Sequence, residues 1–241
     1  MSQPVSASDV TAILENFPRY LDVSIHRANT TLAEIREMCD YGLKEGFNVI
    51  TNSGFTRYAR QYVGDNAPIL VGATVGFPFG TASTFAKTME AQRAIEDGAD
   101  EVDMVMAVGL LREGPQHYAE VEEDIRSVVE AVHKAGGKTT KVIIETCYLN
   151  PTEKEAACHI VTRAGAEFIK TSTGYGPGGA TLEDAILMRK LSGPNTRVKA
   201  AGGIRTLAQC LEYIHVGVER LGIGLSGALP ILEEVRKAKA S

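Results

Sequence analysis

Short apolar runs alternate with amphipathic stretches along this sequence, and that alternation constrains the fold more than any other feature. Each run precedes a pattern typical of a helix, and the eight runs are Leu21–Ile25, Phe47–Thr51, Ile69–Val75, Glu101–Val105, Lys141–Glu145, Glu167–Lys170, Val198–Ala200 and Arg220–Gly222. Strands of a parallel sheet are buried on both faces, so they read as continuous Val, Ile and Leu runs. The pattern therefore predicts eight strand–helix units.

Helix boundary signals fall between these runs. Thr31 and Glu34 have the spacing of a capping box, ahead of a helix that Gly46 is expected to end. Further helix starts are indicated at Pro151, Thr181 and Thr206. The helix that starts at Pro151 is expected to end near Gly165.

Eight units without a linker-like segment predict one domain over residues 1–241, an α/β protein of the closed (β/α)₈ or TIM-barrel type with a short N-terminal helix. Such barrels take about 250 residues, and the carboxyl ends of their strands converge on one face where sites are built. A doubly wound open sheet is the alternative that the pattern leaves open.

Charge and composition exclude several classes of protein. The net charge is −5 and the basic residues are scattered, which argues against a nucleic-acid-binding face. No apolar run approaches the roughly 18 residues of a membrane helix, and the polar N-terminus does not look like a signal peptide. The cysteines lack paired short spacing, so we expect reduced thiols and a cytoplasmic location; they are Cys39, Cys147, Cys158 and Cys210.

Two lysines lie in consecutive apolar runs, and a buried amine is costly enough to need an explanation. Lys170 ends one run, and Lys199 lies within the next, just before a Gly-Gly turn. Neighbouring strands would bring the two amines close, and each cation would lower the pKa of the other while burial adds to the shift. An unperturbed lysine, with a pKa near 10.4, is a free amine only about once in 2,500 molecules at neutral pH, and each unit of depression gives about tenfold more nucleophile.

Asp103 completes a candidate catalytic group. Gly98–Asp103 and Gly165–Lys170 share one form, in which a helix-ending glycine precedes a short acidic turn and a strand, so Asp103 and Lys170 occupy matching positions. A single lysine at a strand end is more often a snorkelling or ion-paired side chain, and a single strand aspartate is more often structural. Two such lysines with an inward aspartate favour an amine-based aldolase, in which Asp103 moves protons through water or through Lys199.

Glycine-rich segments follow each of the last three runs. Barrel enzymes often hold a phosphate there with backbone N–H groups and a helix N-terminus. Any one segment is more simply an ordinary tight turn, but three in succession favour a phosphate site; they are Gly176, Gly178 and Gly179, Gly202 and Gly203, and Gly222–Gly227.

The longer motifs resemble deoxyribose-phosphate aldolase, from about Leu21 to Gly224 and in the order of that family. They are Val75-Gly-Phe-Pro-Phe-Gly80, Glu101-Val-Asp-Met-Val105, Lys141-Val-Ile-Ile-Glu-Thr-Cys-Tyr-Leu149, Phe168-Ile-Lys-Thr-Ser-Thr-Gly174, Gly179-Ala-Thr-Leu-Glu-Asp184 and Val198-Lys-Ala-Ala-Gly-Gly-Ile-Arg-Thr206. The resemblance implies a barrel that reversibly cleaves 2-deoxy-D-ribose 5-phosphate to acetaldehyde and D-glyceraldehyde 3-phosphate, with neither metal nor cofactor.

The resemblance also assigns roles to residues. It makes Lys170 the Schiff-base lysine, Lys199 the second lysine and Asp103 the proton-relay aspartate. The substrate-binding residues that we expect are Asp22, Thr171, Gly202, Gly203, Gly224 and Ser226. The implied partners are small sugar-phosphate and aldehyde substrates, with no nucleic acid or membrane, and a homodimer is left open.

Three segments depart from the family pattern. This chain has Asp22-Val-Ser24 where the family has Asp-His-Thr, and Thr51-Asn-Ser-Gly54 where the family has a turn like Cys-Val-Asn-Pro. Where the family has a phosphate-binding turn like Gly-Thr-Ser-Ser-Gly, this chain has Gly222-Ile-Gly-Leu-Ser-Gly227, in which Ser226 is the one hydroxyl residue. These departures leave an aldolase of altered acceptor preference open.

Two rival functions remain. A non-catalytic sugar-phosphate-binding barrel would need no reactive amine. A metal-dependent aldolase would need clustered ligands, but the histidines show no ligand-like spacing and four of them fall in predicted helices; they are His26, His117, His133, His159 and His215.

Overall fold

The computed structural model describes residues 7–240, and its eight strands close into a parallel barrel in chain order. This confirms the predicted (β/α)₈ fold and excludes the open sheet. The strands are β1 (Leu21–Ser24), β2 (Asn48–Asn52), β3 (Val71–Val75), β4 (Glu101–Val105), β5 (Thr139–Ile143), β6 (Phe168–Lys170), β7 (Arg197–Ala201) and β8 (Val218–Gly224).

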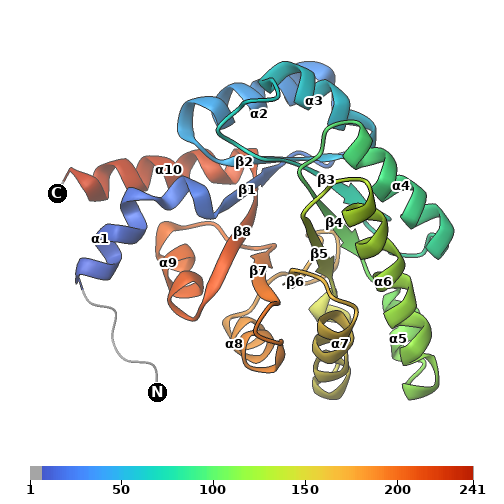
Figure 1. Cartoon of the computed structure of the whole chain (residues 1–241). Coiled ribbons are helices and arrows are strands. Elements are labelled where there is room, and N and C mark those ends of the chain that lie inside the picture. The colour runs from blue at the N-terminus through green and yellow to red at the C-terminus, as the bar shows by residue number, and fades with distance from the viewer. Residues whose placement is uncertain (1–6, 241) are drawn as a thin grey trace.

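Helices surround the ring of strands, as Figure 1 shows. They are α1 (Ala7–Glu15), α2 (Leu32–Glu45), α3 (Thr56–Val63), α4 (Thr84–Glu96), α5 (Val108–Arg112), α6 (Tyr118–Lys134), α7 (Pro151–Arg163), α8 (Leu182–Leu191), α9 (Leu207–His215) and α10 (Leu225–Lys239). The predicted N-terminal helix is α1, which lies beside α10 (Figure 1). Within residues 7–240, none of the helices combines the length and the apolar character that crossing a bilayer requires.

Local sequence signals explain where these helices begin and end. Thr31 and Glu34 form the predicted capping box of α2, and Gly46 ends that helix in the left-handed conformation at φ 89°. Thr181 and Thr206 cap α8 and α9 through their hydroxyls. The helix α7 begins at Pro151 as predicted but ends at Arg163, two residues before Gly165.

Two strands end elsewhere than the apolar runs suggest. The strand β5 stops at Ile143 rather than at Glu145, because Glu145 adopts a left-handed backbone with φ 50° that cannot continue a strand. The strand β8 continues past Gly222 to Gly224, which pairs with Ser24 of β1, and α10 begins at the next residue. The glycine-rich segment after Gly222 is thus the end of a strand and the first turn of a helix, not a separate loop.

The apolar core lies between the barrel and its helices. Strand residues that face outward, such as Val102, Val142 and Val198, are fully buried against that layer. Successive side chains of a strand point to opposite faces, so the residues between them point into the barrel. Along β4 and β5 those inward residues include Glu101, Asp103 and Lys141, all fully or almost fully buried. The barrel therefore has a charged interior inside an apolar shell.

Candidate active site

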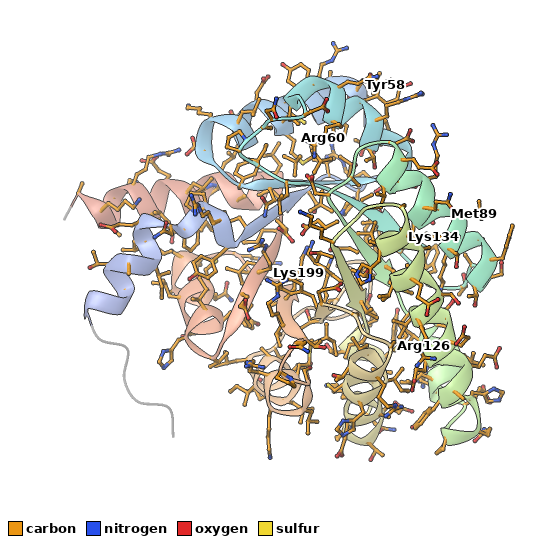
Figure 2. All side chains as sticks on the ribbon, viewed as in Figure 1. Tyr58, Arg60, Met89, Arg126, Lys134 and Lys199 are labelled. Atoms are coloured by element: carbon orange, nitrogen blue, oxygen red, sulfur yellow. The ribbon has the colours of Figure 1, made fainter. Side chains whose placement is uncertain are left out.

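The two predicted lysines lie side by side. Lys170 of β6 pairs directly with Lys199 of β7 in the sheet, so both side chains project into the barrel. Figure 2 shows Lys199 inside the ring of strands, whereas Arg126 and Met89 lie on the outer helices. Lys170 is 5% exposed and Lys199 is 1% exposed. Sequence reasoning placed these amines together correctly.

Asp103 joins the two amines. Its Oδ2 accepts hydrogen bonds from Lys170 Nζ at 2.7 Å and from Lys199 Nζ at 2.8 Å. Asp103 pairs with Lys141 in the sheet, and Lys170 pairs with Ile143, so the aspartate lies one inward position deeper than Lys170. The long lysine side chains reach back to it. The three residues singled out from the sequence thus form one hydrogen-bonded group.

A third buried lysine, Lys141, belongs to the same cluster, and sequence reasoning gave it no role. Its Nζ donates to Asp103 Oδ1 at 3.0 Å and to Glu101 Oε1, and it lies 3.3 Å from Asp22 Oδ2. Glu101 was missed as well, although it stands two residues before Asp103 and so shares its inward face. That strand alternation was the signal that could have found it.

Asp22 ties the cluster to β1. Its Oδ2 accepts from Lys199 Nζ at 2.5 Å, and its Oδ1 accepts from the Asn48 amide at 3.1 Å. The Arg220 guanidinium Nε lies 3.5 Å from the same Oδ1. Asp22 was expected to bind substrate, which stays a prediction; in the structure its partners are charged side chains of this cluster and the Asn48 amide.

Burial makes Lys170 a better nucleophile. Desolvation lowers the pKa of Lys170 to about 8, and the positive charge of Lys199 adds to this effect while Asp103 opposes it. A pKa near 8 leaves about one molecule in ten as the free amine at neutral pH, compared with about one in 2,500 for an unperturbed lysine. The predicted direction is confirmed, and burial rather than the neighbouring amine is the larger cause.

Burial and neighbouring charges act in opposite directions on Asp103 and Lys141. Burial works against ionisation of Asp103, but Lys141, Lys170 and Lys199 outweigh it and hold the pKa of Asp103 well below its ordinary value. Burial likewise opposes the charge of Lys141, yet Asp103, Asp22 and Glu101 raise the pKa of that amine. Glu101 is different, because burial raises the pKa of its carboxyl.

A cavity of about 640 Å³ opens above Lys170 and Lys199 at the carboxyl ends of the strands. Asp22 and Ser24 also line it, whereas Asp103, Glu101 and Lys141 do not. Asp103 therefore reaches the cavity only through the amines that it binds. A group bound in the cavity would meet two amines backed by a buried carboxylate.

Glycine turns and the N-terminus of a helix line part of this cavity. Gly202 and Gly203 follow β7 with φ values of 86° and 78°, a left-handed backbone conformation that residues other than glycine rarely adopt. Gly224 caps α10, and Ser226 lies in the first turn of that helix; all four residues line the cavity. The first N–H groups of a helix have no partners within it, and they favour an anion. The arrangement can hold a phosphate.

Two other predicted elements lie elsewhere. Gly176, Gly178 and Gly179 do not line the main cavity; Gly174 does so instead. Thr171 does not line it either, because alternation turns its side chain away from the side that Lys170 faces. The Thr171 hydroxyl donates to the Ala201 carbonyl at 3.1 Å and accepts from the Ala201 N–H at 3.0 Å. The Thr171 hydroxyl therefore fastens β6 to β7, and its expected role in substrate binding stays a prediction.

His26 and Tyr175 line the cavity without having been predicted to do so. His26 Nδ1 bonds Asn52 Oδ1 at 2.8 Å, and burial, with the positive charge of Lys170, lowers the pKa of His26 to about 4. Each stands in a loop after a strand, with no periodic pattern to mark it. Within the described residues 7–240, no group of three or more His, Cys, Asp or Glu side chains is arranged to hold a metal ion.

Comparison with known families gives a match over nearly the whole chain. Residues 9–231 match the model of the DeoC/LacD family aldolases. The deoxyribose-phosphate aldolase of Thermococcus kodakarensis is 46% identical over 217 residues, which cover 89% of this chain and 95% of that protein. The deoxyribose-phosphate aldolase of Coprothermobacter proteolyticus is 43% identical over 221 residues, which cover 91% of this chain and 97% of that protein.

Solved structures agree with this match. The aldolase QR15 superposes with a TM-score of 0.85 at 32% identity and covers 92% of this chain and 97% of its own. The tetrameric deoxyribose phosphate aldolase of Aeropyrum pernix superposes with a TM-score of 0.83 at 25% identity and covers 97% of this chain and all of its own. The barrel and its length are thus shared with aldolases of solved structure.

Proposed function

This chain belongs to the DeoC/LacD family of aldolases, and we propose that it reversibly cleaves 2-deoxy-D-ribose 5-phosphate to acetaldehyde and D-glyceraldehyde 3-phosphate. The observation that carries the proposal is the buried amine of Lys170, which lies 2.7 Å from Asp103 and lines the cavity beside Lys199. The names of the relatives described above support the choice of substrate.

The proposed chemistry begins at Lys170. The free amine attacks the C1 aldehyde of the open-chain sugar, and loss of water gives an iminium. That cation is an electron sink, so removal of the C3 hydroxyl proton breaks the C2–C3 bond and leaves an enamine on Lys170. Glyceraldehyde 3-phosphate leaves, the enamine carbon takes a proton, and hydrolysis of the resulting iminium frees acetaldehyde and the lysine.

Lys199 and Asp103 supply the protons in this scheme. Lys199 lines the cavity and donates to both Asp103 and Asp22, so it can pass a proton to a bound group or to water and recover one. Asp103 lies behind both amines and acts through them. Asp22 holds Lys199 in place, and the turns at Gly202, Gly203, Gly224 and Ser226 would bind the phosphate.

Borohydride trapping tests the proposal. Incubation with acetaldehyde and borohydride should add a two-carbon group to Lys170, which peptide mass spectrometry locates. A non-catalytic sugar-phosphate-binding barrel would show no adduct, and labelling confined to Lys199 would exchange the roles of the two lysines. Lys170→Met is the matched control, because it should lose both the adduct and turnover.

We also propose that the chain can associate as a homodimer through Phe85 and Met89, which lie one turn apart on α4 and are exposed to solvent by 75% and 45%. Light scattering of the wild type and of Phe85→Lys tests that association. The enzyme acts in the cytoplasm, because a charged sugar phosphate does not cross a bilayer unaided, and cell fractionation tests that location.

A further inference from the structure

Tyr175 lies across the mouth of the barrel, where loops from three strands meet. Its hydroxyl donates to the His26 carbonyl, after β1, at 2.7 Å. Its ring contacts Phe77, from the loop after β3, edge-on with centroids 5.5 Å apart. Phe77 also contacts the His26 ring, with centroids 4.8 Å apart. The loop after β6, which carries Tyr175, is thereby tied to two loops on other sides of the barrel.

A second cavity of about 80 Å³ lies beyond this aromatic contact. Val105 and Glu145 line it at the ends of β4 and β5, and Tyr148 lines it from the segment that follows β5. Thr173 and Tyr175 line both this cavity and the main one. Those two residues are therefore the wall between the two spaces.

The wall is held firmly and the space behind it is largely apolar. Glu145 is buried, and its Oε2 accepts the Thr173 N–H at 3.0 Å. A non-glycine residue at φ 50° costs on the order of 1–3 kcal/mol, so the surrounding structure must hold Glu145 in that conformation. With its carboxylate bound to the wall, the remaining lining is mainly aliphatic and aromatic; it includes Pro78, Phe79, Val105 and Val108. Such a space suits an alkyl group rather than a charged one.

Lys170 lines the main cavity together with the wall residues Thr173 and Tyr175, so a group bound to its amine lies in a space that the wall bounds. A chain bound to the amine and ending in phosphate at Gly202 and Gly224 occupies the main cavity. We expect a substituent on the carbon next to the imine carbon to point away from this chain, toward Thr173 and Tyr175, which line the same cavity as Lys170. In the synthetic direction that carbon belongs to the donor aldehyde, which is acetaldehyde in the proposed function.

We propose that the Tyr175 ring limits the donor aldehyde to two carbons, and that the small cavity behind it is a subsite for the alkyl group of a longer aldehyde once the ring is removed. This inference rests on the proposed aldolase function. Shortening Tyr175 joins the two cavities, and the phosphate-binding turns are unchanged.

The test compares donors with glyceraldehyde 3-phosphate fixed as the acceptor. The quantity measured is the ratio of kcat/KM for propanal to kcat/KM for acetaldehyde. One methylene accommodated in an apolar pocket is worth about 10- to 200-fold in this ratio, so Tyr175→Ala is expected to raise it at least about tenfold. Tyr175→Leu, which keeps more of the loop packing, should raise it in the same direction if the Ala variant is unstable.

Two control variants separate ring bulk from other causes. Tyr175→Phe keeps the ring but loses the hydrogen bond to His26, and Tyr148→Ala enlarges the small cavity but leaves the wall. Both should keep a ratio close to that of the wild type. An unchanged ratio in Tyr175→Ala and Tyr175→Leu would overturn the proposal, and so would an equal rise in either control. Wild-type turnover of acetaldehyde checks the proposed function separately, since its absence would refute the aldolase and not the wall.

Discussion

Replacing two buried lysines of the same barrel by methionine is expected to change stability in opposite directions. Burial lowers the pKa of Lys170 from 10.5 to about 8, so the folded protein disfavours its charge. At about 1.4 kcal/mol per pKa unit, the penalty at pH 7 is about 3 kcal/mol. Methionine has nearly the length of lysine without the charge, so Lys170→Met should be more stable than wild type by up to about 3 kcal/mol. The loss of one donor to Asp103 reduces that gain.

Lys141 is the opposite case. It contacts three carboxylates, and they raise its pKa above that of a free lysine despite its complete burial. Removing it leaves Asp22, Glu101 and Asp103 with less compensating charge in a buried place. Breaking a buried ion pair from one side costs about 3–5 kcal/mol. We therefore expect Lys141→Met to lose at least about 3 kcal/mol.

The pH dependence distinguishes charge from packing. Below pH 8, Lys170 is protonated in both the folded and the unfolded chain, so the folded protein bears the full free-energy cost of burying this charge. Between pH 8 and pH 10.5 the folded protein loses this proton first, and the penalty fades. The advantage of Lys170→Met should therefore shrink from pH 7 to pH 10. Lys141 has a raised pKa, so its contribution to the stability of the folded protein is complete below about pH 10.5. The loss of stability in Lys141→Met should therefore stay nearly constant from pH 7 to pH 10.

Urea denaturation of the three proteins at pH 7 and pH 10 measures these differences, with equal m-values as the condition for comparing free energies of unfolding. The reasoning fails if Lys170→Met is no more stable than wild type at pH 7. It also fails if the advantage is the same at both pH values, since packing alone would then explain it.

Three further predictions test the site. Lys199→Leu removes the cation that helps to lower the pKa of Lys170. The rising limb of the pH–rate profile is expected near pH 8 in wild type and should move to higher pH in this variant. A limb at the wild-type pH would contradict this prediction. Ser226→Ala should reduce the kcat/KM preference for deoxyribose 5-phosphate over deoxyribose by about ten- to a hundredfold, because one charge-assisted hydrogen bond to the phosphate is lost. An unchanged preference would show that backbone N–H groups suffice to bind the phosphate. Thr171→Val leaves the buried Ala201 N–H without this side-chain partner, so the free energy of unfolding measured in urea should fall by about 1–3 kcal/mol. KM should stay unchanged, and a raised KM would instead show that Thr171 contributes to substrate binding.

The sequence predicted the barrel because its signals are local. Each buried run reads as a strand whatever its partners are, and caps such as that of Thr31 act within one helix turn. Lys170 and Lys199 were found because a charged residue at the end of an apolar run is conspicuous. The contact that Thr171 makes in the structure could not be predicted in the same way, because its hydroxyl bonds Ala201 of the neighbouring strand, 30 positions further along the chain.

The residues that were missed depend on contacts between distant segments. Tyr175 meets His26 across 149 positions of sequence, and no local pattern marks such a pair. Lys141 contacts Asp22 and Glu101 on two other strands, and its charge lies at the start of an apolar run, where a residue commonly snorkels to solvent. Only the barrel stagger shows that it points inward. The end of β5 at Ile143 was also hidden, because the left-handed turn at Glu145 is held by Thr173 from another loop.

The number of carboxylate partners supports the proposal that Lys170, rather than either neighbouring lysine, is the nucleophile. Among the residues that the structure describes, Lys141 contacts three carboxylates, Lys199 contacts two and Lys170 contacts one. Formally, three carboxylates face these three amines and Arg220, so the cluster has one positive charge in excess while Lys170 is protonated and none when it is neutral. The excess proton leaves most readily from the amine with the weakest compensation. Because Lys170 also lines the cavity, the amine that loses its proton most readily is one that a bound sugar would reach, as the proposed function requires.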